Sequence, residues 1–167
     1  MSATMAPLRA EHRDLLPHIE KFRVAAEAIG TAPPERVVAL VDECVLFLTH
    51  HLLPHAKAEE AALYPVVQKV MGAARATATM SRDHEEVGRL TAELRDLRAS
   101  LTPAEAGGSR AAGLQRVLYG LYTLIKVHFA KEEEVYLPLL EKHLPADEAE
   151  AMFTAMHEAA TKGHTAE

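Results

Sequence analysis

Apolar residues recur at spacings of three and four along four long segments of the chain, which is the pattern of amphipathic helices. The pattern predicts helices at about residues 5–29, 34–71, 74–100 and 109–143, with a short fifth helix near 146–160. Glycine or proline residues stand at the breaks, at 30–34, at 72, within 101–109 and at 145. No alternating run of β-branched residues indicates a sheet. The sequence therefore predicts an all-α fold.

Four long helices joined by short loops predict an antiparallel up-down-up-down four-helix bundle. The chain has 167 residues, 49% of them hydrophobic, which is enough apolar material for one buried core. We expect residues 1–145 to form the bundle and residues 146–167 to form a short C-terminal helix and tail.

Each apolar stripe is interrupted by a histidine, and in two of the helices a glutamate follows one turn later. These six ionisable core positions are His12, His55, Glu59, His84, His128 and Glu132. Within each His-x-x-x-Glu pair the side chains share one helix face, because residues four apart are neighbours on a helix. At a rise of about 1.5 Å per residue, the four histidines come to one level of the bundle. We therefore expect the six side chains to meet in one layer of the core.

The polar core positions occur twice along the chain. The offset from His12 to His84 equals the offset from His55 to His128 to within a single position. Both His-x-x-x-Glu motifs have a proline at the tenth position after the histidine. The chain is therefore predicted to consist of two helical hairpins of similar design.

Burying six ionisable groups in one core layer costs free energy that other interactions must offset. An unpaired buried charge costs several kcal/mol, and a domain has only about 5–15 kcal/mol of stability in total. No lysine or arginine lies on the four stripes. Bound cations would compensate directly, and imidazole with carboxylate suits iron, manganese or zinc. One histidine from each helix and two glutamates able to bridge favour two ions, with positions left for oxide, hydroxide, peroxide or another small anion.

The pattern H…HxxxE…H…HxxxE, over roughly residues 5–140, resembles the hemerythrin-like HHE cation-binding domains. The resemblance implies an antiparallel four-helix bundle around a non-haem di-iron centre with an oxo or hydroxo bridge. It further implies that His12 and His55 bind one iron and that His84 and His128 bind the other. Glu59 and Glu132 would then bridge the two ions.

One departure from the oxygen-carrying hemerythrins bears on function. Those carriers have a fifth histidine, four residues before the third-helix ligand, and here that position is Met80. They also place an aspartate five residues after the fourth-helix histidine, where this chain has Glu133, while Glu132 holds the offset of four. A missing fifth histidine opens a coordination position or requires a substitute ligand. This favours peroxide or redox chemistry over simple reversible carriage of dioxygen.

Further candidate ligands and supporting residues lie near the six. His51 is expected at the rim, with a fifth ligand as the alternative, and His18 is expected on the helix flank. Glu60 and Glu133 follow the proposed bridges and are expected on solvated faces, because the next residue turns by about 100°. The four tyrosines are expected to be packing residues, with a ligand or hydrogen bond near the metal from one of them as the alternative; they are Tyr64, Tyr119, Tyr122 and Tyr136. Glu11 and Asp83 are expected as surface charges, with orientation of another helix's imidazole as the alternative.

Composition narrows the function classes. A net charge of −6 argues against a nucleic-acid partner, and no apolar run approaches the roughly 18 residues of a membrane span. One cysteine and the lack of a secretory signal suggest the cytoplasm. We expect a domain that binds dioxygen, peroxide, nitric oxide or another small anion, with catalase-like or peroxidase-like activity left open. The alternatives are an iron or oxygen sensor or store that acts through a partner protein, and a bundle holding redox-silent zinc.

Overall fold

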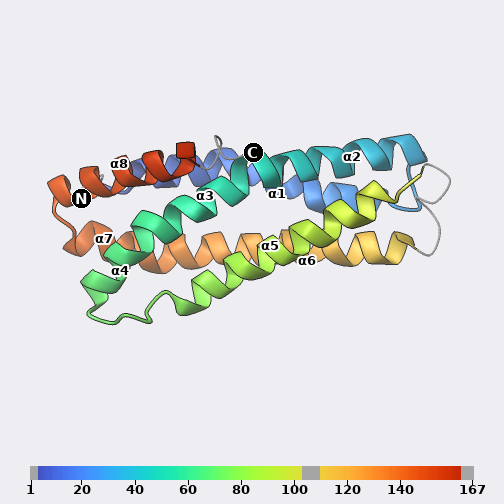
Figure 1. The fold of residues 1–167 in the computed structure, drawn as a ribbon. Coiled ribbons are helices and arrows are strands. Elements are labelled where there is room, and N and C mark those ends of the chain that lie inside the picture. The colour runs from blue at the N-terminus through green and yellow to red at the C-terminus, as the bar shows by residue number, and fades with distance from the viewer. Residues whose placement is uncertain (1–3, 103–109, 163–167) are drawn as a thin grey trace.

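A computed structural model describes residues 4–102 and 110–162, and these residues form an all-α bundle without strands (Figure 1). The first long rod is α1 (Ala6–Ala28) and the third is α5 (Ala78–Ala99). The second rod is continuous through α2 (Pro34–Phe47), η1 (Leu48–Leu52), α3 (Leu53–Ala58), η2 (Glu59–Leu63) and α4 (Tyr64–Met71). The fourth rod comprises α6 (Arg110–Lys131), η4 (Glu132–Tyr136) and α7 (Leu137–His143), and α8 (Ala146–Lys162) follows it.

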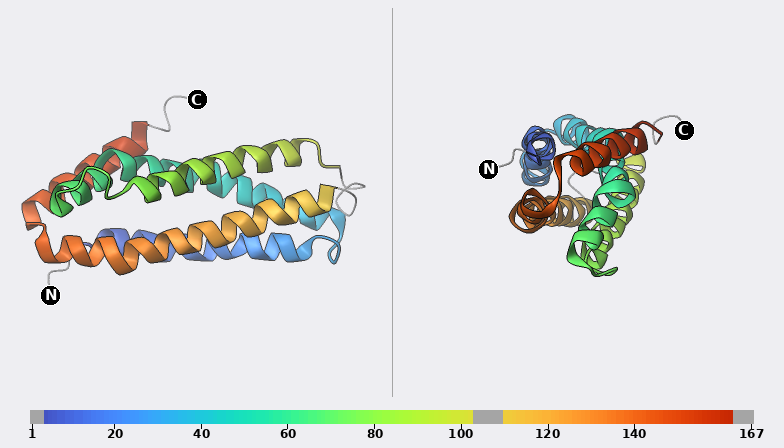
Figure 2. Two further views of the ribbon diagram at one scale, coloured as in Figure 1. Left: turned by 90° about the horizontal axis from the view of Figure 1, so that it is seen from below. Right: turned by 90° about the vertical axis from the view of Figure 1, so that its left-hand side faces the viewer.

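The four long rods surround one core. The first rod packs against the fourth and second, and the third packs against the fourth and second (Figure 2). The fifth helix, α8, lies against α3 and η2 of the second rod. The predicted all-α bundle is confirmed, and the predicted helix near 146–160 is α8. The predicted break within 101–109 lies mostly outside the described residues.

Local sequence explains where the second rod begins and ends. Pro34 stands in its first turn, where the missing N–H is not needed by the helix. Gly72 ends the rod with φ of 63°, a left-handed conformation that glycine adopts without a Cβ clash. The N–H of Ala73 then donates to the carbonyl of Gln68. The glycine and proline punctuation of the sequence therefore sets this rod's length.

Three π-helical turns, η1, η2 and η4, interrupt the second and fourth rods. Each turn ends two residues before a proline, at Pro54, Pro65 and Pro138. Proline has no N–H to donate to the carbonyl four residues earlier, so the hydrogen-bond ladder shifts locally. Two of these turns begin at Glu59 and Glu132. The backbone is thus irregular at the two glutamates predicted to bridge metals.

The core is divided into two apolar clusters. One cluster contains Leu15, Val87 and Ile125, and the other contains Leu8 and Met80. The predicted polar layer lies between them, since each of its histidines stands between members of both clusters along its own rod. The core therefore has an apolar–polar–apolar sequence along the bundle.

The second rod, Pro34–Met71, is long and apolar enough to cross a membrane by length and composition alone. Core helices of soluble proteins pass the same test. Here the apolar face packs inside the bundle and the rod also places His55 and Glu59 in the core. This property is weak evidence for a membrane span.

Candidate metal centre

The structure brings all six predicted residues together. They come from four rods: His12 from α1, His55 and Glu59 from α3 and η2, His84 from α5, and His128 and Glu132 from α6 and η4. Both glutamates are fully buried, and three of the histidines are buried. His84 is the most exposed of the six, with 12% of its side chain accessible. Donor atoms from these residues fall into two groups that could each hold an ion.

Glu59 lies between the two groups of histidines. Its Oε1 is 3.0 Å from Nε2 of His55 and 3.8 Å from Nε2 of His12. Its Oε2 is 3.3 Å from Nε2 of His84 and 4.0 Å from Nε2 of His128. Each carboxylate oxygen therefore faces a different pair of imidazoles.

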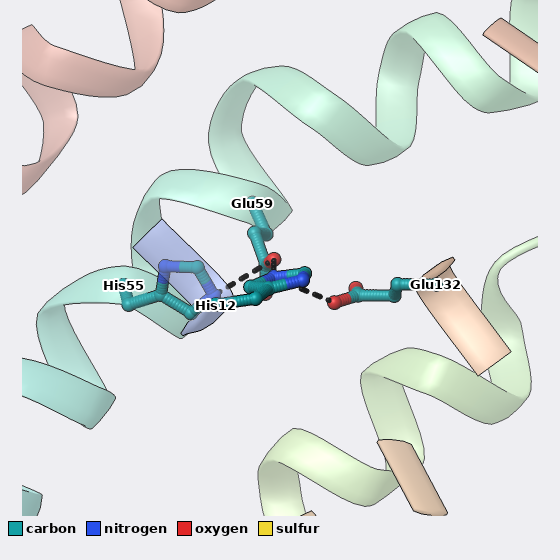
Figure 3. Close-up of side chains that lie close together, drawn as sticks. All are labelled: His12, His55, Glu59 and Glu132. Carbon is teal, nitrogen blue, oxygen red and sulfur yellow. Dashed lines mark ion pairs between the residues drawn. The ribbon is translucent and has the colours of Figure 1, made fainter. Parts of the chain in front are cut away.

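Glu132 spans the same gap from the opposite rod. Its Oε2 is 3.5 Å from Nε2 of His12, and its Oε1 is 3.4 Å from Nε2 of His128. Figure 3 shows Glu132 and Glu59 pointing toward His12, with His55 beside them. Two buried carboxylates thus face one another across the space enclosed by the histidines.

Each of the four imidazoles has its Nδ1 against a carboxylate. Because an ionised carboxylate can only accept, each Nδ1 carries a hydrogen, and in the neutral imidazole that a metal binds, each Nε2 then presents a lone pair. The pairs are His12 with Glu133 at 2.8 Å, His55 with Glu11 at 2.9 Å, His84 with Glu60 at 2.8 Å, and His128 with Asp83 at 3.1 Å. Glu60 is exposed, as expected, whereas Glu133 is partly buried, and both carboxylates also bond an imidazole, which the expectation of a solvated face did not include. For Glu11 and Asp83, the alternative of orienting another helix's imidazole is the one the structure shows.

These residues fit a metal because their inward atoms lack other partners. Five buried atoms accept or donate no hydrogen bond among the described residues: Nε2 of His12, Nε2 of His55, both oxygens of Glu59 and Oε2 of Glu132. The Nε2 atoms of His84 and His128 face one another at 3.0 Å, and both are acceptors when the two imidazoles are neutral. Orphaned buried polar atoms are rare, and facing lone pairs repel. Cations in this layer would remove both costs.

A family model, the hemerythrin HHE cation binding domain, matches residues 4–140. The chain belongs to this family. No curated protein and no solved structure matches the chain. Membership implies cation binding, typically of iron, and the His/Glu cluster of this HHE domain is where a cation would bind.

The buried charges of the HHE domain shift one another's pKa values in opposite directions. Burial alone would raise the pKa of Glu59, but the charge of His55 holds it well below its ordinary value. Burial and then the charge of Glu59 raise the pKa of Glu132. Burial lowers the pKa of His55, yet Glu59 and Glu11 raise it well above its ordinary value. The layer without metal therefore keeps protons that a bound cation would replace.

Tyr64 is the tyrosine that reaches the site of the HHE domain. Its hydroxyl donates to Oε1 of Glu132 at 3.0 Å and lies 3.4 Å from Nε2 of both His84 and His128. Its ring stacks on His84 with centroids 5.4 Å apart. Burial, followed by the charges of Glu59 and Glu132, raises its pKa, so the hydroxyl stays protonated.

The other tyrosines and histidines named from the sequence lie elsewhere. Tyr136 donates to the carbonyl of Ala76, Tyr122 donates to Glu20, and Tyr119 is exposed. His18 and His51 are exposed and stack on Phe47, outside both groups of donor atoms. The fifth-ligand alternative for His51 is therefore not what the structure shows.

A small apolar cavity of about 10 Å³ lies beside the polar layer, lined by Leu52, Val87, Ile125 and Phe129 together with His55, Glu59, His84 and His128. This volume is close to the smallest that holds one water-sized molecule. A wider groove between α3 and α5 lies outside it, and Ala56 and His84 line both spaces. Ala56 and His84 thus border both the cavity beside the donor atoms and the groove outside it.

Proposed function

We propose that this HHE domain holds two metal ions, iron in the cell, within an antiparallel four-helix unit, and that it binds dioxygen or its reduced relatives there. His12 and His55 would bind one ion, His84 and His128 the other, and Glu59 and Glu132 would bridge. The observation that carries the proposal is that both oxygens of Glu59 are buried, accept no hydrogen bond and are directed at different histidine pairs. Manganese or zinc would fit the same donors.

An iron pair supplies electrons and open positions for a small ligand, while the protein controls access, water and protons. The cavity beside the site is apolar and small, so it favours dioxygen, nitric oxide or peroxide over larger molecules. Met80 is buried in α5 where the oxygen carriers have a histidine. Tyr64, on the neighbouring rod, holds a protonated hydroxyl between His84 and His128. That hydroxyl is placed to donate a hydrogen bond or a proton to a small ligand.

Turnover of peroxide is the enzymatic form of this function. In the balanced reaction, two peroxide molecules give two waters and one dioxygen, so one peroxide loses the two electrons that the other gains. Tyr64 and Glu132 form the hydrogen-bonded pair that could hold the proton at this site. Such a domain acting in the cytoplasm would need no partner for this reaction, whereas a peroxidase-like cycle would need a redox partner that supplies electrons.

The test begins with metal content and an optical spectrum. The anaerobically reduced, iron-loaded protein is measured before oxygen, after oxygen, and after oxygen is removed. Two irons per chain and a visible band that appears with oxygen or peroxide would support the proposal. Release of oxygen from peroxide, absent in Glu59→Ala, would add the enzymatic form. One ion or none per chain, or no band with either ligand, would contradict it.

A further inference from the structure

Four carboxylates form a closed circuit around the metal centre, and we call Glu11, Glu60, Asp83 and Glu133 the carboxylate ring. Each rod gives one carboxylate to the histidine of the next rod. Glu11 of the first rod bonds His55 of the second, and Glu60 of the second bonds His84 of the third. The circuit then closes in two further bonds, from Asp83 of the third rod to His128 and from Glu133 of the fourth rod to His12.

The circuit follows the internal repeat of the sequence. Glu11 and Asp83 are equivalent positions of the two repeats, and each directly precedes a histidine of the site. Glu60 and Glu133 are likewise equivalent, and each directly follows a buried glutamate. Four bonds that arise from two repeated units, without exception, are a systematic feature of the fold. Chance surface pairing would not reproduce the same donor atom, Nδ1, four times.

Most ring carboxylates are themselves held in place. A guanidinium nitrogen of Arg9 pairs with Glu133, and the ammonium of Lys131 pairs with Asp83. In the second repeat, Ser81 occupies the position that Arg9 holds in the first, and its hydroxyl donates to Oε2 of Glu60 at 2.9 Å. Glu60 therefore bonds His84 with one oxygen and Ser81 with the other, with no cation among these contacts.

We infer that the carboxylate ring consists of positioning residues that fix all four imidazoles with Nε2 inward and stabilise the more oxidised state of a bound metal pair. The inference rests on the proposed metal centre. A carboxylate that accepts from Nδ1 sets the ring orientation and makes the imidazole a stronger donor to a metal. Four negative charges outside two bridging carboxylates also make the centre more anionic, which favours higher metal charge.

Glu60 is the best position for a test. Its side chain is 40% exposed, so substitution there does not disturb the core. Replacing it does not free a lysine or arginine, as replacing Asp83 or Glu133 would. Glu60→Gln removes the charge and keeps an oxygen that can accept from Nδ1 of His84, whereas Glu60→Ala removes both. Glu134→Gln is the matched control, because Glu134 is exposed and stands next to a ring member without facing a histidine.

The experiment measures two properties of the folded full chain. The first is the dissociation constant for Co²⁺, obtained by competition with a chromophoric chelator. The second is the midpoint potential of the iron-loaded protein, obtained by spectroelectrochemistry. We expect Glu60→Ala to weaken Co²⁺ binding about 10- to 100-fold and Glu60→Gln to recover most of that loss. Both variants should shift the midpoint potential to more positive values than the control.

The outcomes separate this inference from the proposed function. If the parent protein binds two Co²⁺ ions and both Glu60 variants match Glu134→Gln in affinity and potential, the ring has no positioning role and the inference is overturned while the metal centre stands. If Glu60→Gln binds Co²⁺ no better than Glu60→Ala, orientation through Nδ1 is overturned. If the parent binds no Co²⁺, the proposed function and the inference fail together.

Discussion

The hydroxyl of Tyr64 crosses the core of the bundle to donate a hydrogen bond to Glu132, with 3.0 Å between the two oxygens. The second and fourth rods supply the two partners, and each partner lies at or next to a π-helical turn. This bond is a contact within the site that does not involve a histidine. It joins the proposed proton donor directly to a proposed bridging ligand.

Removing the Tyr64 hydroxyl should impair ligand chemistry more than metal binding. In Tyr64→Phe, we expect two metals per chain and a fall of about tenfold or more in peroxide turnover, since positioned proton donors contribute at least that much. Oxygen release and metal analysis measure the two effects. The control is Tyr122→Phe, which removes a hydroxyl bonded to Glu20 away from the site. Equal turnover in the two variants would exclude a chemical role for Tyr64.

Metal should stabilise the fold, and the effect should depend on Glu59. A cation that binds only the folded chain raises its stability with concentration, by about 2.7 kcal/mol at 100 times the dissociation constant. We expect the midpoint temperature of unfolding to rise with Zn²⁺ and to fall again with a chelator. In Glu59→Ala this response should be lost, and the metal-free variant should be less stable than the metal-free parent because His55 loses its buried partner. Unchanged Zn²⁺ stabilisation in that variant would contradict the ligand assignment.

The pH dependence of stability should differ between the metal-free and metal-loaded protein. The raised pKa of His55 gives stability that is present below its unfolded value, about 6.5, and is lost as pH rises through the folded value. The pKa of His84 is also raised, so it acts in the same direction. The metal-free protein should therefore lose stability above about pH 6.5, whereas metal stabilisation should grow with pH as protons leave the ligands. Urea unfolding from pH 6 to 9, with chelator and with Zn²⁺, tests the two trends. Metal-free stability that rises over this interval would contradict the assignment.

Filling the small cavity should slow ligand access without removing metal. Val87→Leu adds a methylene beside a space of about 10 Å³, so we expect slower spectral changes on mixing with dioxygen or peroxide. Overpacking should cost about 1–3 kcal/mol of stability. Val117→Leu is the matched control, because Val117 is buried in the core but does not line the cavity. Identical rates in the two variants would show that ligands reach the site by another route.

Cys44 should be inert in the folded protein. Burial raises the pKa of its thiol to about 12, so almost no thiolate exists at pH 8. We expect labelling by a disulfide reagent to be far slower than in urea-unfolded protein. Cys44→Ala should keep its peroxide turnover. Rapid labelling under native conditions, or loss of turnover in that variant, would assign the thiol a part in the chemistry.

The periodicity of the sequence was enough to predict the rods and the six inward residues. Helical spacing fixes which residues share one face, and His12, His55 and Glu59 each follow an apolar stripe into the core. The π-helical turns were not predicted, although Pro65 and Pro138 at equal offsets were the available signal. A proline predicts a missing hydrogen bond, but whether the ladder kinks or widens depends on packing.

The carboxylate ring shows where prediction from sequence alone is limited. Glu60 and Glu133 each lie about 100° from a buried glutamate, which places them at the border between core and solvent. Such a position is solvated on an isolated helix and bonded when a neighbouring helix brings a donor to it. The distance between rods decides the outcome, and no single-helix pattern contains that distance. The repeated pairs Glu11-His12 and Asp83-His84 were the sequence signal that a carboxylate of one helix bonds a histidine of the next.

The apolar–polar–apolar order of the core also restricts how the rods can align during folding. A one-turn slip of α1 would bring Leu8 or Leu15 to the level of Glu59 and Glu132, and would move His12 into an apolar cluster. Buried ionisable groups are stabilised by one another and by a cation, whereas burying them unpaired among hydrocarbon side chains costs free energy. The same six residues that await metal therefore define a single register for the four rods. In this bundle the polar layer of His and Glu residues therefore specifies the register of the rods in addition to forming the candidate metal site.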